Sequence, residues 1–208
     1  ATTFVQEDIL RQLEMPQAEV QVAGFERPNL FFEVCQTRSR AEKLDRIEAL
    51  ATHHEGSPLV VYCATRKQVE QVASEVGERG FDTGTYHGGM EGRKRERTQT
   101  AWMQGDIPVL VATKAFGMGV DKPDVRGIVH FNIPGSIEAY YQEAGRAGRD
   151  GRESNCVLLF NDADRGIHEF FIENSYPERA TVEAVWSEAS RHGTGRHRLD
   201  GDSIAGAL

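Results

Sequence analysis

The chain has 208 residues, of which 39% are apolar and 27% charged, with a formal net charge of −8. This composition is typical of a globular protein with a sizeable core. No apolar run approaches the roughly 20 residues that a membrane span needs, and no signal peptide is visible, so we expect no membrane partner and a cytoplasmic location, nucleoid-associated in a bacterium.

Short apolar runs alternate with amphipathic segments along the chain. Strands are predicted at 30–35, 59–63, 81–86, 107–112, 127–131 and 156–160. Helices are predicted at 40–53, 66–79, 91–104 and from 136 to about 149. This alternation predicts an α/β fold, with a parallel sheet that carries helices on both faces.

The character of the chain changes after Asp162. Residues 162–174 and 178–191 look helical and acidic, whereas 193–208 are Gly-rich and polar. We expect a lead-in over 1–19, the α/β domain over 20–162, a short helical extension over 163–192, and a linker or the start of a further module over 193–208. Because the chain begins Ala-Thr-Thr without Met, we also expect it to be an excised fragment.

The chain has three cysteines, and each lies beside apolar residues: Cys35, Cys63 and Cys156. No two of them have a metal-ligand spacing, and an odd number argues against a disulfide framework. They are predicted to be buried free thiols, so no zinc or other metal site is expected.

The negative net charge argues superficially against a nucleic-acid partner, but the basic residues are clustered. One cluster lies within 93–97, and a second contains Arg146, Arg149 and Arg152. A local basic stripe can bind a phosphate backbone whatever the overall charge.

Ligands of open parallel sheets bind beyond the carboxyl ends of the strands. Thr65 and Arg66 follow the second predicted strand, where Thr65 can cap a helix whose free amides attract an anion, or simply be a cap. His87 and Gly88 follow the third strand, where glycine permits close approach of a ligand and His87 is alternatively a hydrogen-bonded turn residue.

The segment after the fourth predicted strand has several polar groups suited to a nucleotide. Thr113 can bind a phosphate oxygen through its hydroxyl and amide, and Gly117 and Gly119 keep the loop open. Asp121 can accept from a sugar hydroxyl, or it can be a turn former beside Pro123.

Arg146 and Arg149 stand three residues apart within QEAGRAGRD (142–150), on what reads as one helix, so they are expected to share a face. Small residues surround them, which suits the close approach of a phosphate to a planar guanidinium. The alternative is a surface pair bonded to Glu143 and Asp150.

Five segments of the chain match the sequence pattern of a known protein family. They are GFERPNLFFEV (24–34), LVVYCATR (59–66), TYHGGM (85–90), VLVATKAFGMGVDKPDVRGIVHFNIP (109–134) and YYQEAGRAGRDG (140–151). Together they resemble the second motor lobe of superfamily 2 helicases, and within it the RecQ family of DNA helicases. The combination of AFGMGVDKPDVR with QEAGRAGRDG is specific, because related RNA helicases share the GRxGR core but usually not the FGMG-DKP string. The resemblance covers about 20–162 and implies a RecA-like lobe.

The resemblance also implies roles for residues at matching positions. Arg149 would be the arginine finger that reaches the γ-phosphate of ATP, and Arg146 would support it and couple hydrolysis to movement. Gln142, Gly119 and Asp121 would lie near the nucleotide. The positions implied to contact DNA, largely through phosphates, are Thr65, Arg66, His87, Gly88 and Thr113. Arg95, Gln99 and Trp102 match further spaced positions of the family, and Trp102 is expected to belong mainly to the core.

The chain departs from the family pattern by two substituted residue pairs and by the absence of three motifs. Gly89-Met90 replaces Ala-Leu, and Ala64-Thr65 replaces Asn-Ser. The sequence contains no G-x-x-x-x-G-K-[ST] phosphate loop, no DEAH-type box and no four-cysteine zinc subdomain. Either this branch lacks the zinc site or the site lies beyond residue 208.

These departures define the expected cofactors and partners. ATP and Mg²⁺ are expected to be held mainly by a first lobe, which residues 1–13 would follow, and the 208 residues are not expected to hydrolyse ATP alone. The expected partners are that first lobe and single-stranded and duplex DNA, with 3′–5′ unwinding in DNA repair or recombination. The alternatives are a superfamily 2 RNA helicase lobe, and a non-catalytic nucleic-acid or partner-binding module of the same fold, which retention of both arginines disfavours.

Overall fold

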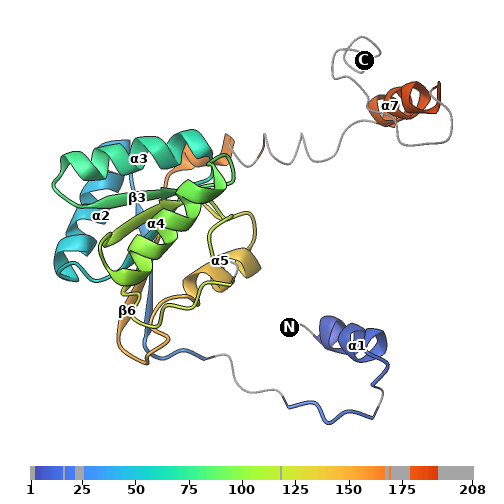
Figure 1. The fold of residues 1–208 in the computed structure, drawn as a ribbon, viewed down its shortest axis with the longest axis horizontal. Coiled ribbons are helices and arrows are strands. Elements are labelled where there is room, and N and C mark those ends of the chain that lie inside the picture. Colours follow the sequence, from blue (N-terminus) through green and yellow to red (C-terminus); the bar gives the residue numbers. More distant parts are fainter. Residues whose placement is uncertain are drawn as a thin grey trace.

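The computed structural model describes residues 3–15, 17–21, 26–117, 119–166, 169 and 179–191. It contains a six-stranded sheet of order β1-β6-β5-β2-β4-β3, and all its strand pairs are parallel (Figure 1). The strands are β1 Leu30–Gln36, β2 Leu59–Tyr62, β3 Thr83–Tyr86, β4 Val109–Ala112, β5 Gly127–His130 and β6 Ser154–Phe160. All six predicted strands therefore form.

The described helices flank or follow this sheet. They are α1 Thr3–Gln12, α2 Arg40–His53, α3 Arg66–Glu78, α4 Gly92–Gln104, α5 Ile137–Ala144 and α7 Arg179–Arg191, with a 3₁₀ turn, η1, at Asp162–Asp164. The prediction of a helix over 178–191 is confirmed by α7. The described part of the predicted 162–174 segment is helical at 162–166 and 169; residues 167–168, 170–174 and the predicted tail 193–208 lie outside the described residues.

Helices cover both faces of the sheet because successive strand residues point to opposite sides. Val61 and its neighbours pack with α2 and α3 in one buried cluster. Val60 and Tyr62 pack on the other side with Trp102 of α4 and Ala144 at the end of α5. The predicted α/β architecture with helices on both faces is thus confirmed, and Trp102 is a core residue, 1% exposed.

The fourth predicted helix is shorter than expected. It ends at Ala144, and 145–150 form turns, so the prediction that Arg146 and Arg149 share a helix face is wrong. The amides of Arg146 and Ala147 bond only three residues back, and Gly148 has a φ of +54°, which leaves the helical region. Glycine is a poor residue for a helix interior; Gly145 is the C-cap at which this helix ends, and Gly148 lies in the turns beyond it.

The three cysteines are buried and free, as predicted. Burial raises the pKa of Cys63 and of Cys156 to about 12, and burial together with Glu33 raises that of Cys35 to about 11. These thiols are therefore protonated at neutral pH.

The chain leaving β6 stays attached to the domain through one buried carboxylate. Asp164 accepts a hydrogen bond from Lys43 Nζ at 2.5 Å and another from Asn132 Nδ2 at 3.1 Å. Asn132 Oδ1 in turn accepts from the amide of Ala64, at the end of β2. The beginning of the extension is therefore fixed to the same edge of the sheet as the predicted DNA contacts.

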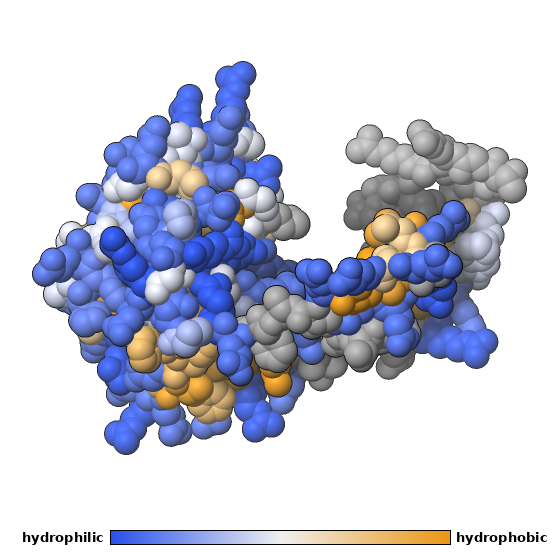
Figure 2. Space-filling view, turned by 90° about the horizontal axis from the view of Figure 1, so that it is seen from below, coloured by the Kyte–Doolittle hydropathy of each residue, from blue (hydrophilic) through white to orange (hydrophobic). Residues whose placement is uncertain are grey.

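The surface is mostly hydrophilic on the face seen in Figure 2, with apolar areas between the polar side chains. The edge strand β1 exposes Phe31, Phe32 and Val34 at 50%, 48% and 66%. Among the described helices, none combines the length and the apolar character that crossing a bilayer requires.

Candidate nucleotide and nucleic-acid interface

The loops that follow β2, β3 and β4 lie side by side. Their strands are neighbours in a parallel sheet, so their carboxyl ends share one edge. The amide of Thr113 donates to Tyr86 O at 3.0 Å, and that of Cys63 donates to Ala112 O at 2.8 Å. This edge gathers the five residues predicted to contact DNA, which we call the strand-end cluster: Thr65, Arg66, His87, Gly88 and Thr113.

Thr65 is the N-cap of α3, as predicted. Its hydroxyl accepts from the amide of Gln68 at 3.2 Å, and its backbone is extended. Arg66 begins the helix and lies over the glycine pair of the next loop, where a Cβ on Gly89 would stand 2.8 Å from Arg66 Nη1. Arg66 is exposed, and within the described residues its side chain has no hydrogen bond or ion pair. Its charge is therefore available to an anion.

His87 is 7% exposed and fully hydrogen-bonded. Gly89 donates its amide to Nδ1 at 3.2 Å, so this nitrogen is unprotonated, and Nε2 donates to Glu70 Oε1 at 2.8 Å. The interpretation of His87 as a hydrogen-bonded turn residue is confirmed. The exposed Gly88 leaves the backbone as the open part of this loop.

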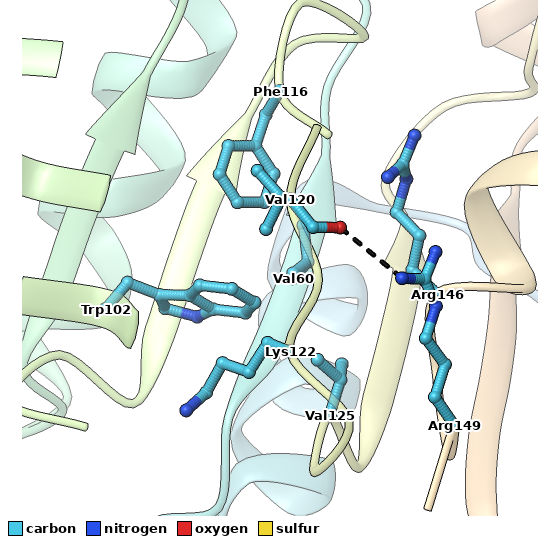
Figure 3. Close-up of a pocket in the computed structure, with 8 residues that line it drawn as sticks. All are labelled: Val60, Trp102, Phe116, Val120, Lys122, Val125, Arg146 and Arg149. Carbon is cyan, nitrogen blue, oxygen red and sulfur yellow. Dashed lines mark hydrogen bonds between the residues drawn. The ribbon is translucent and has the colours of Figure 1, made fainter. Parts of the chain in front are cut away.

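The segment 113–126 joins β4 to β5, and we call its described residues, 113–117 and 119–126, the strap. Phe116, Val120 and Val125 pack into the core beneath it (Figure 3). The strap begins at Thr113, in the strand-end cluster, and Asp121 lies in its later half with a side chain that is 81% exposed. The strap therefore exposes polar groups on its outer side and packs apolar side chains against the core.

The arginine loop, residues 145–150, contacts the strap through both of its arginines. Arg146 Nη1 donates to Gly117 O at 2.5 Å, and its Nε is buried without a partner in the described part of the chain. Gly117 has a φ of +121°, and a Cβ there would stand 2.2 Å from Arg146 Cζ, so both backbone and space require glycine.

Arg149 contacts the strap at two points. Its Nη1 donates to Asp121 Oδ1 at 2.6 Å and to Val120 O at 3.5 Å, the latter drawn in Figure 3. The structure therefore brings together three of the predicted nucleotide residues, Arg146, Arg149 and Asp121. Gly119, with a φ of +73°, lies on the same strap. Gln142 is exposed on α5, and its side chain makes no hydrogen bond to another described residue.

The alternative partners considered for the arginines were wrong. Glu143 pairs with His130 Nε2 at 2.7 Å, and Asp150 pairs with Arg126 Nη2 at 2.5 Å. The hydrogen bond from Arg126 holds the pKa of Asp150 below its usual range, so this carboxylate is ionised at neutral pH. The side chain of Arg126 is 10% exposed and fixes the loop from beneath.

Sequence reasoning missed the residues that support the arginine loop. Arg126 also donates to Ser154 Oγ and to Glu153 O, which joins the starts of β5 and β6. Arg27 and Asn29, which lie just before β1, donate to loop carbonyls. The only sequence signal was Arg-Pro-Asn itself, a turn sequence that says nothing about a partner about 120 residues away in the chain.

The two groups of site residues lie at different ends of the sheet. The strand-end cluster lies at the carboxyl ends of β2, β3 and β4. The arginine loop lies near the amino ends of β5 and β6, because the amide of Gly148 donates to Val125 O at 2.9 Å. The strap is continuous between the two groups. No group of three metal-ligating side chains occurs in the part of the chain that the structure describes.

A model of the helicase conserved C-terminal domain matches residues 41–151, more than half of the chain. The chain belongs to this family.

Several of the relatives are RecQ-type helicases, which confirms the resemblance, and one, 38% identical over 178 residues, is named a putative ATP-dependent RNA helicase of Acanthamoeba polyphaga mimivirus. The chain is 39% identical over 178 residues to the ATP-dependent DNA helicase RecQ of Bacillus subtilis, covering 86% of this chain and 30% of that protein. It is 40% identical over 165 residues to the RecQ-like DNA helicase BLM of Xenopus laevis, covering 79% of this chain and 12% of that protein. The chain thus spans less than a third of either relative.

The fold is also that of solved helicase lobes. A Saccharomyces cerevisiae Dbp5 structure bound to RNA and ADP BeF3 matches with a TM-score of 0.62 at 20% identity, over 80% of this chain and 46% of that one. At this identity the match concerns the fold alone, and it agrees with the RecA-like lobe implied by the sequence.

Proposed function

We propose that the chain is the second motor lobe of an ATP-dependent 3′–5′ DNA helicase of RecQ type that acts in DNA repair or recombination. The observation that carries this proposal is the strap, which begins at Thr113 beside the predicted DNA contacts and reaches Arg149 through Asp121. One continuous segment therefore touches both groups of site residues. Such a connection is what a motor needs to couple hydrolysis to movement along a strand.

ATP is the substrate that the arginine loop fits. The side chain of Arg149 is 36% exposed and is bound to a carboxylate that is 81% exposed, so a phosphate can replace that carboxylate as its partner. Phosphoryl transfer depends mainly on positioning and on stabilisation of developing charge, and an arginine finger supplies both. Arg146 supports the strap, and Asp121, once released, is free to accept from a ribose hydroxyl.

A first lobe supplies the remaining parts of the site in this proposal. The 208 residues contain no phosphate loop, so Mg²⁺ and most of the nucleotide are held by that lobe, and this chain alone does not hydrolyse ATP. DNA-stimulated ATPase activity of the purified 208 residues would contradict this part of the proposal.

The strand-end cluster fits the sugar-phosphate backbone of a DNA strand. Arg66 is an exposed cation without an ion-pair partner among the described residues, Thr65 and Thr113 carry hydroxyls, and Gly88 exposes its backbone. Contacts of this kind position a strand without reading its sequence, as unwinding of arbitrary sequence requires. The names of the DNA helicase relatives favour DNA over RNA, and a strand-displacement assay on matched DNA and RNA duplexes separates the two.

Arg149→Ala in the full-length chain tests the ATP half of the proposal. We expect kcat for DNA-stimulated ATP hydrolysis to fall by about 10³-fold, because the charge on the transferred phosphoryl group loses its stabilising cation. Arg152→Ala is the matched control, since Arg152 is also exposed and its side chain has no hydrogen bond among the described residues. If Arg149→Ala hydrolyses ATP at the rate of Arg152→Ala, the arginine-finger assignment is wrong.

A further inference from the structure

The segment Arg27-Pro28-Asn29, which we call the anchor turn, makes five hydrogen bonds to the arginine loop and its neighbour Arg152. Arg27 donates to Gly145 O at 3.4 Å, to Ala147 O at 2.9 Å and to Gly148 O at 2.7 Å. Asn29 Nδ2 donates to Gly148 O and to Arg152 O, each at 2.8 Å. No other described side chain bonds to these three loop carbonyls.

Two of the three bonded loop carbonyls belong to the peptide groups that lead into the two arginines. The carbonyl of Gly145 belongs to the peptide bond with Arg146, and that of Gly148 to the peptide bond with Arg149. Each such plane fixes the Cα position and the initial direction of the arginine that follows it. The carbonyl of Gly148 receives two side-chain donors in addition to the amide of Gly151 at 3.0 Å, so the plane before Arg149 is held most firmly.

Helix α5 ends immediately before these carbonyls, and its own last carbonyls, those of Glu143 and Ala144, accept from the amides of Arg146 and Ala147. The half-buried guanidinium of Arg27 supplies donors to that region, with the planar geometry that suits several acceptors at once. Pro28 is the second residue of a turn closed by Leu30 N to Arg27 O at 3.0 Å, which fixes Arg27 and Asn29 before they meet the loop.

We propose that Arg27 is a positioning residue for ATP hydrolysis, which acts by holding the peptide planes that orient Arg146 and Arg149. The inference rests on the proposed function of Arg149. In this role Arg27 touches no substrate and contributes through the backbone of the arginine loop. Its loss lets the loop move while the arginine side chains remain present.

Arg27→Gln in the full-length chain tests this inference. We expect kcat for DNA-stimulated ATP hydrolysis to fall by about 10- to 100-fold, since misplacement of a catalytic group by about 1 Å has effects of this size. The KM for ATP and the affinity for single-stranded DNA should change by less than about threefold, because the strand-end cluster is untouched. The matched control is Arg79→Gln, which removes a guanidinium that bonds Asp45 and Glu48 on the opposite face of the sheet.

A double variant distinguishes positioning from general destabilisation. If Arg27 acts through Arg149, then Arg27→Gln combined with Arg149→Ala is no slower than Arg149→Ala alone. If the double variant is slower than Arg149→Ala by the full factor lost in Arg27→Gln, the inference is overturned. It is also overturned if Arg27→Gln keeps the wild-type kcat while Arg149→Ala is slow. Both outcomes leave the proposed function intact. A wild-type rate for Arg149→Ala itself would overturn both.

Arg27→Lys decides the question if Arg27→Gln does not fold. Lysine keeps the charge but carries its donors on a single nitrogen, so it does not reproduce the fork of Arg27. A reduced kcat with an unchanged thermal midpoint supports positioning by the guanidinium, and an unchanged kcat rejects it.

Discussion

The strand-end cluster and the arginine loop both present guanidinium groups, but they hold them differently. Arg66 projects from the start of α3 and has no hydrogen bond within the described residues. Arg149 already has a carboxylate partner, and Arg146 a carbonyl partner, on the strap. The cluster can therefore meet a phosphate without breaking an internal bond, whereas Arg149 must exchange one partner for another.

The backbones beneath these guanidinium groups differ as well. The arginine loop is held by three side chains from two separate parts of the chain, Arg27 and Asn29 of the anchor turn and Arg126 before β5. Arg66 stands on the ordinary backbone of a capped helix. The difference agrees with the proposed tasks, because a γ-phosphate must be met at one place while a translocating strand must be held and released repeatedly.

The largest effect of all is expected in the arginine loop, from Gly148→Ala. A Cβ there would stand 2.5 Å from Asn29 Nδ2 and 2.7 Å from Arg152 O, in addition to the strain of a φ of +54°. We expect the free energy of unfolding to fall by about 2 kcal/mol or more, as measured by urea titration. We also expect the ATPase activity of the full-length chain to fall.

Gly151→Ala is the matched control for this substitution. Gly151 has a φ of +83°, but nothing lies within 4 Å of its added Cβ, so only the backbone strain remains. Its cost should be about 1–2 kcal/mol, with little effect on kcat. Equal losses in the two variants would mean that packing of the anchor turn against the loop adds nothing.

An intermediate effect is expected in the strand-end cluster, from Arg66→Ala. Loss of one phosphate contact should weaken single-stranded DNA binding at every sequence and should reduce the slope of log affinity against log salt by about 1. Lys67→Ala, at the exposed neighbouring position, is the control. An unchanged salt slope would mean that Arg66 does not contact the DNA backbone. A change in KM for ATP would mean that the strand-end cluster and the arginine loop do not act independently.

The sequence predicted the sheet well and the site only in part. Strands such as 59–63 were recognisable because a buried parallel strand is a continuous apolar run, and Thr65 as a cap because its hydroxyl acts within three residues. The end of α5 was missed because the amides of Arg146 and Ala147 turn to three-residue hydrogen bonds, a change that leaves no mark in the pattern of apolar residues. The partners of Asp150 and Glu143 were also missed, since pairing between side chains distant in sequence leaves no local pattern.

The smallest effect is expected from Asp121→Asn, which tests how easily Arg149 is released. The ion pair joins side chains that are 36% and 81% exposed, so water and salt screen it. Exposed pairs of this kind contribute about 0–1 kcal/mol, and the free energy of unfolding should change by less than about 0.5 kcal/mol in urea titrations.

The control is Asp150→Asn, which removes the charge that faces Arg126, a side chain only 10% exposed. That change should cost roughly 2 kcal/mol or more, because a nearly buried guanidinium loses its counter-charge. If Asp121→Asn instead costs as much as Asp150→Asn, Arg149 is a structural residue, and its exchange of a carboxylate for a phosphate is too unfavourable to occur in each catalytic cycle. A small cost for Asp121 beside a large one for Asp150 means that the loop is fixed at Asp150 by Arg126 while the side chain of Arg149 remains free to move to ATP.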